Sequence, residues 1–141
     1  MKILLAVDGS AYTAKAIDYI AANRGMFVDG QVLILVHVCA GIPGHVARHV
    51  SKDVVQDYYS EEQSKVLEPL KKLLAERNIG NYRTDARHGH AAEEIIEAAS
   101  EHDAGLIVMG THGHGLFGRA LMGSVATKVV AESKVSVLLV K

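Results

Sequence analysis

The segment GTHGHGLFGRALMGSVATKVV, residues 110–130, changes abruptly from a glycine-rich run to apolar residues at helical spacing. Glycine is needed where the backbone adopts a positive φ, or where another group must approach the backbone closely. The apolar run Leu106–Met109 before it predicts a buried strand, and the periodic run Gly123–Ala131 predicts a helix. A glycine loop that leads into a helix start is typical of phosphate binding, because the first N–H groups of a helix attract anions.

The same alternation of strand and helix extends outward to both ends of the chain. Continuous apolar runs predict buried strands at Lys2–Val7, Gln31–Cys39 and Val135–Val140. The stretch Tyr82–His88 alternates with charged residues, as a strand near a sheet edge does. The predicted order is therefore βαβαβαβαβ, which favours a parallel sheet with helices on both faces.

The intervening segments carry helix and loop signals. Ser10 can cap a first helix, and Gly25 is a plausible end for it. The stretch Ala40–Lys52 contains two glycines and a proline and is expected to be a loop. A long helix is predicted from Asp53 to about Asn78, kinked or broken at Pro69, followed by a shorter helix over Ala92–Ser100.

Composition limits the functions that the chain can have. Its 141 residues predict one domain over 1–141, with a net charge of −1 that argues against nucleic acid and anionic membrane surfaces as partners. Cys39 is the single cysteine, which fits a reducing, cytoplasmic setting. The apolar run at the N-terminus is too short for a signal peptide or a membrane span, so no membrane insertion is expected.

Three phosphate-binding patterns compete for the glycine loop. The Walker A pattern is absent, because no Gly-Lys-Ser or Gly-Lys-Thr occurs in the chain. Residues 113–118 satisfy G-x-G-x-x-G, but no later strand ends with an acidic residue for a ribose. The third pattern, G-x2-G-x9-G-S, joins Gly110, Gly113, Gly123 and Ser124 across the carboxyl edge of the sheet.

This third pattern is similar to the ATP-binding signature of universal stress proteins. The runs KILLAVDGS, LILVHV and VSVLLVK also resemble the first, second and last strands of that family, in order and without large insertions. The resemblance implies a three-layer α/β/α sandwich with a five-stranded parallel sheet of order 3-2-1-4-5, the adenine nucleotide alpha hydrolase-like fold. A ligand is then expected where the order reverses, between strands 1 and 4.

The resemblance also implies roles for individual residues. Asp8 would hold the ribose, Ala6 and Val38 would lie beside adenine, and Met109 would pack on the base. The phosphate cradle would comprise Gly110, Gly113, Gly123, Ser124 and Val125. Val7 and Ser10 complete the candidate set beside Asp8. One of the two loop histidines, His112 or His114, is hypothesised to contact a phosphate. Mg²⁺ or Mn²⁺ can accompany the phosphates, although no carboxylate cluster offers a dedicated cage.

The chain departs from the family pattern at three positions. Ala126 stands where a second hydroxyl residue is frequent, Gly105 where an aspartate is usual, and His112 where arginine is common. The loss of one hydroxyl puts nucleotide affinity and triphosphate preference in question. Eight histidines invite a metal site, but the pairs His45/His49, His88/His90 and His112/His114 lack a third ligand placed by the sequence.

The leading hypothesis is a regulatory, stress-response protein that binds ATP, ADP or AMP with slow or no turnover. The alternatives are an interaction scaffold that uses no nucleotide, and a weak ATPase or autophosphorylating protein. The strand Val135–Val140 would lie at the sheet edge and is apolar, so a homodimer through it is predicted.

Overall fold

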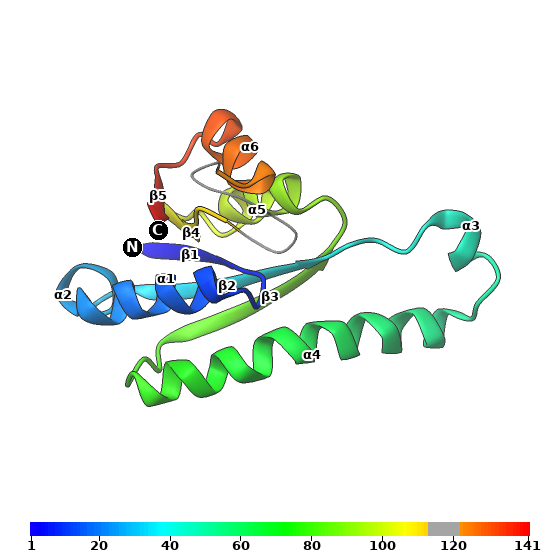
Figure 1. Cartoon of the computed structure of the whole chain (residues 1–141), viewed down its shortest axis with the longest axis horizontal. Coiled ribbons are helices and arrows are strands. Elements are labelled where there is room, and N and C mark those ends of the chain that lie inside the picture. Colours follow the sequence, from blue (N-terminus) through cyan, green and yellow to red (C-terminus); the bar gives the residue numbers. More distant parts are fainter. Residues whose placement is uncertain (113–121) are drawn as a thin grey trace.

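The computed structural model describes residues 1–112 and 122–141, which form a five-stranded parallel sheet between two helical layers (Figure 1). The strand order is β3-β2-β1-β4-β5, and every neighbouring pair is parallel. The strands are β1 (Lys2–Val7), β2 (Val32–Cys39), β3 (Tyr82–His88), β4 (Leu106–Gly110) and β5 (Val137–Val140). The predicted fold class and the predicted order 3-2-1-4-5 are therefore confirmed.

Helices cover both faces of the sheet because alternate strand residues point to opposite sides. Ile3 and Leu5 pack with α1 (Ala11–Ala22), α2 (Arg24–Phe27) and α4 (Lys52–Glu76). Leu4 packs on the other face with α5 (Ala91–Glu101) and α6 (Ser124–Glu132). The short helix α3 (Gly44–Ala47) and the first turn of α4 stand beyond the end of the sheet (Figure 1), whereas Tyr59 and Gln63 of α4 already contact β3 and β2.

Pro69 does not break the long helix. Helix α4 runs without interruption from Lys52 to Glu76, so the predicted break is wrong. A proline removes one backbone hydrogen bond. Pro69 is exposed, whereas Leu67 and Leu70 on either side of it are buried in the core. Packing on both sides of the proline therefore holds the helix together.

Three further boundaries differ from the prediction. Helix α1 ends before Asn23, and Gly25 lies inside α2 instead of ending a helix. The predicted loop 40–52 contains the single turn α3 and the first residue of α4. The last strand begins at Val137 and not at Val135. The N–H and C=O of Val135 are instead hydrogen-bonded to the Ser133 hydroxyl.

A network of charged side chains ties the edge strand β3 to α5. Arg87 pairs with Asp85 at 3.0 Å, with Glu94 at 3.5 Å and with Glu101, and His102 Nε2 lies 2.7 Å from Asp85 Oδ2. Burial raises the pKa of Asp85, but hydrogen bonds from Arg87 and His102 outweigh it and hold that pKa below its ordinary value. Asp85 is therefore charged in the fold and stabilises this edge.

Within the described part of the chain, no helix has both the length and the apolar character needed to cross a bilayer.

Candidate functional site

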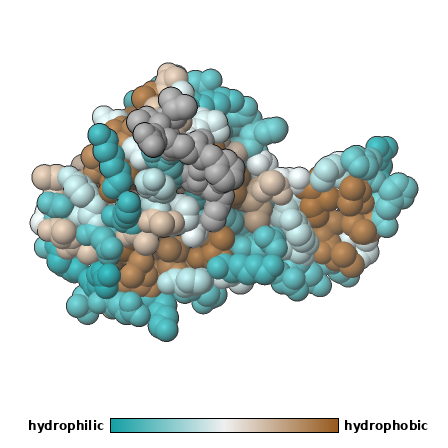
Figure 2. All heavy atoms as spheres, in the orientation of Figure 1, coloured by the Kyte–Doolittle hydropathy of each residue, from teal (hydrophilic) through white to brown (hydrophobic). Residues whose placement is uncertain are grey.

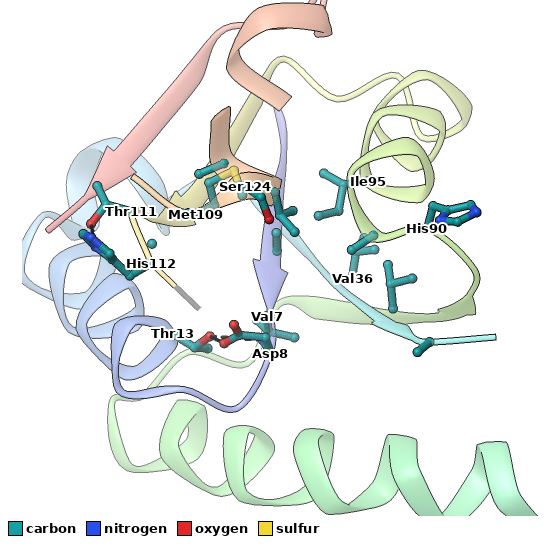
Figure 3. A pocket seen from close by; sticks show the side chains of 18 of the residues that line it. Val7, Asp8, Thr13, Val36, His90, Ile95, Met109, Thr111, His112 and Ser124 are labelled. Atoms are coloured by element: carbon teal, nitrogen blue, oxygen red, sulfur yellow. Dashed lines mark hydrogen bonds between the residues drawn. The ribbon is translucent and has the colours of Figure 1, made fainter. Parts of the chain in front are cut away.

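A cavity of about 520 Å³ opens at the carboxyl ends of the strands, at the point where the strand order reverses between β1 and β4 (Figure 3). Open α/β sheets bind ligands at this place. The cavity brings together ten of the predicted site residues: Ala6, Val7, Asp8, Val38, Met109, Gly110, His112, Gly123, Ser124 and Val125. Ser10 does not line it, and Gly113 lies outside the described residues.

One side of the cavity is apolar. Val36 and Val38 from β2, Met109 from β4 and Ile95 from α5 line it, together with Ala6 from β1. Met109 and Ile95 are almost completely buried, so the wall is packed from behind by the core. A flat apolar ring fits such a wall, since most ligand pockets combine apolar surfaces with a few polar groups.

Asp8 is oriented by donors from the loop and helix that follow it. The Ser10 N–H donates to Asp8 Oδ1 at 2.9 Å, and the Thr13 hydroxyl donates to the same oxygen at 2.9 Å (Figure 3). The Thr13 oxygen also accepts from the Asp8 N–H at 3.1 Å. Thr13 is only 3% exposed and itself lines the cavity. The carboxylate is therefore preorganised before a ligand arrives.

Ser10 contributes to the site through its backbone. It occupies the N-cap position of α1 with extended φ and ψ, but its side chain makes no capping hydrogen bond, contrary to the prediction. Its buried hydroxyl has no hydrogen-bond partner within the described chain. The N–H that holds Asp8 is thus the part of Ser10 that matters for the site.

The structure gives a packing reason for glycine at 110, whereas the backbone of Gly123 does not require glycine. A Cβ on Gly110 would lie 2.6 Å from Tyr12 Cβ and 3.3 Å from the Tyr12 backbone, so β4 and α1 approach too closely for a side chain. Gly123 has φ −61°, which any residue adopts, and its N–H donates to the Thr111 carbonyl at 2.7 Å. That N–H is therefore already engaged by the protein.

The start of α6 lies at the cavity. The first N–H groups of a helix have no intrahelical partner. Ser124, Val125 and Ala126 occupy this first turn, line the cavity, and have no side-chain cap before them. The positive end of the helix dipole adds to their attraction for phosphate. Ala126 is buried and brings no hydroxyl, whereas the next hydroxyl, on Thr127, donates to the Gly123 carbonyl.

His112 is held at the mouth of the cavity by two neighbours. Its Nδ1 lies 2.8 Å from Thr111 Oγ1, and its ring centroid is 4.9 Å from the ring of Tyr12. The Lys15 ammonium lies over the Tyr12 ring, 5.0 Å from its centroid. These contacts fix the imidazole in place, with its Nδ1 side occupied by Thr111 (Figure 3).

Sequence reasoning missed several lining residues. Thr13, three residues after Ser10, and Thr111, beside Gly110, are hydroxyl residues near predicted site positions, and that signal is too common to single them out. Gly89, His90 and Ala91, at the start of α5, also line the cavity. Among residues 1–112 and 122–141, no three His, Cys, Asp or Glu side chains are grouped closely enough to hold a metal ion.

The model of the Universal stress protein family matches residues 1–141. The universal stress protein of Thermus aquaticus encoded in the QAH/OAS sulfhydrylase 3′ region is 36% identical over 143 residues, covering 99% of this chain and 97% of that protein. The solved structure of the hypothetical protein MJ0577 matches with a TM-score of 0.79 at 25% identity, covering 99% of this chain and 94% of that one. The chain therefore belongs to the universal stress protein family.

More distant solved relatives hold adenine nucleotides. A family protein of Arabidopsis thaliana with AMP bound has 18% identity and a TM-score of 0.68, covering 100% of this chain and 91% of that one. The Archaeoglobus fulgidus protein in complex with dAMP has 21% identity and a TM-score of 0.63, with coverages of 100% and 98%. At identities of 18% and 21%, these two matches show that the fold is shared.

Proposed function

We propose that the cavity binds an adenine nucleotide, ATP or its products ADP and AMP. The observation that carries this proposal is the combination of an apolar wall, an oriented carboxylate and an uncapped helix start around one cavity at the switch point. The base would lie against Ala6, Val38 and Met109, the ribose hydroxyls would donate to Asp8, and the phosphates would accept from the α6 N–H groups. The nucleotide complexes of the structural relatives support this assignment.

The same arrangement supports binding with slow or no turnover. Asp8 is the one acidic residue among the described residues that line the cavity, and the proposed ribose contact occupies it. Fast phosphoryl transfer needs a positioned nucleophile and a metal held near the transferred group. Mg²⁺ or Mn²⁺ would arrive with the phosphates of the nucleotide. Membership of the universal stress protein family supports a role in a stress response, and we propose that this role is regulatory and cytoplasmic, with the nucleotide as a signal or a structural cofactor.

The nucleotide that accompanies the purified protein tests this proposal. The protein is purified without added nucleotide and denatured, and the supernatant is analysed by ion-exchange chromatography with mass detection. Near-stoichiometric ATP, ADP or AMP, reduced in Asp8→Asn, is the expected result. An empty protein that also fails to bind added ATP would favour the scaffold function. Protein-dependent release of phosphate, lost in Asp8→Asn, would favour the weak ATPase.

We further propose a homodimer through the last strand. β5 is an edge strand in the observed order, and Val137, Leu138 and Leu139 are only partly buried within one chain. An exposed apolar edge is prone to pair with another strand, and a two-fold axis lets each copy cover the other. Light scattering at micromolar concentration should give twice the mass of the chain, and a monomer would refute the dimer.

A further inference from the structure

The part of the molecule farthest from the sheet carries an apolar patch that the site does not use. Residues 44–61, called the arm here, comprise α3, the turn after it and the first turns of α4 (Figure 1). Four of the eight large apolar side chains exposed in the described chain lie on the arm: Val46, Val50, Val54 and Tyr58. Figure 2 shows hydrophobic residues gathered on the projecting end of the molecule.

The patch has no role in the cavity or the core. Its four side chains are 40 to 54% exposed, and none belongs to either hydrophobic core cluster or lines the cavity. Single exposed valines are ordinary on protein surfaces, whereas a contiguous apolar patch rimmed by charge usually marks an interaction surface. The arm is therefore expected to be covered by a partner.

The charges that border the patch are separated by sign. Its first half, through α3 and the turn into α4, carries Arg48 and Lys52, with His45 and His49 beside them. Its second half carries acidic residues at four-residue intervals on α4, namely Asp53, Asp57 and Glu61. Within the described chain, none of the five fully charged residues forms an ion pair. The two halves of the arm are therefore complementary in charge.

We propose that the arm binds the arm of a second copy of this chain. In an antiparallel pair about a two-fold axis, the basic half of each arm faces the acidic half of its partner, and the apolar patches meet between them. A two-fold interface uses the same surface on both subunits, which this charge pattern satisfies. A partner of a single charge sign would satisfy only one half of the arm.

With four large apolar side chains on each arm, we expect a weak association that depends on concentration. The arm is separate from the edge strand β5, and a chain that used both surfaces would link dimers into larger assemblies. The arm does not line the cavity, so its association and nucleotide binding are measured independently.

Charge reversal tests the proposal by sedimentation velocity on the full chain, from about 1 to about 100 µM. One variant carries Arg48→Glu and Lys52→Glu, and the other carries Asp53→Lys and Asp57→Lys. Each alone is expected to associate through the arm at least about tenfold more weakly, because like charges then face each other. An equimolar mixture of the two is expected to recover association. In the mixed pair, both halves of the first variant's arm are acidic, and they face basic halves of the second variant's arm.

An apolar substitution and its matched control complete the test. Val50→Glu is expected to remove arm association and to leave any β5 dimer intact. Met26→Glu, at a side chain 65% exposed on α2, is expected to change nothing. The proposal is overturned if Val50→Glu sediments like the wild type, or if the mixture fails to recover association. Binding of the arm to anionic vesicles without self-association would also overturn it and assign the arm to a membrane surface.

Discussion

Replacing Thr13 by valine tests how the site is organised, because the substitution keeps the shape of the side chain and removes its hydroxyl. That hydroxyl donates to Asp8 Oδ1 and accepts from the Asp8 N–H while being almost completely buried. A hydrogen bond to a charged group contributes about 1.5–3 kcal/mol, and a neutral one about 0.5–1.5 kcal/mol. Since the Ser10 N–H still holds Asp8 Oδ1, we expect the free energy of unfolding to fall by about 2–3 kcal/mol.

The same substitution should weaken nucleotide binding, because the Asp8 carboxylate loses one of the hydrogen bonds that orient it toward the ribose position in the free protein. We expect ATP affinity to fall about 3- to 10-fold, measured by isothermal titration alongside urea unfolding. Thr13→Ser keeps the hydroxyl and should recover most of both losses. The reasoning is refuted if Thr13→Val binds ATP like the wild type, or if Thr13→Ser is as weak as Thr13→Val.

Three other predictions follow from packing and charge. Gly110→Ala should lower the free energy of unfolding by about 1–3 kcal/mol in urea melts, because the new Cβ meets the backbone of Tyr12. Asp85 has a lowered pKa, so its stabilisation is present above about pH 4 and is lost as the pH falls through the folded-state pKa. Asp85→Asn should therefore cost about 1–2 kcal/mol at pH 7 and flatten the loss of stability below pH 4 in urea melts across pH. Burial, and secondarily the charge of Glu62, raise the pKa of the Cys39 thiol, so Cys39 should react with a thiol reagent at neutral pH far more slowly in the folded protein than in urea.

Much of the fold could be predicted because β1, β2, β4 and β5 are short apolar runs, and β3 alternates polar and less polar residues as an edge strand does. The sheet order came from resemblance, since no local pattern in β1 or β4 says which strands are neighbours. Pro69 misled the helix prediction because a local rule cannot include the buried leucines on either side of it. The turn α3 was missed because it is short and lies in a segment rich in glycine.

The candidate site shows the same division between sequence and structure. The position of Asp8 after an apolar run was visible in the sequence, whereas the hydroxyl of Thr13 reaches it only once α1 has formed. The glycine pattern marked Gly110 and Gly123 as ligand contacts. Packing against Tyr12 explains Gly110 without a ligand, whereas neither the φ of Gly123 nor its hydrogen bond to the Thr111 carbonyl requires a glycine. The contact between Gly110 and Tyr12 joins segments that meet only in the folded chain, so the sequence alone could not reveal it.

Titration of nucleotide-free protein with ATP tests the central claim most directly. The wild type should bind one ATP per chain. Asp8→Asn should bind about tenfold more weakly, because it replaces a charged acceptor by a neutral one. Asp18→Asn is the matched control, since Asp18 lies on the exposed face of α1, pairs with Arg77 and does not line the cavity. Equal affinity of wild type and Asp8→Asn, or no binding by the wild type, would contradict the assignment of this cavity to an adenine nucleotide.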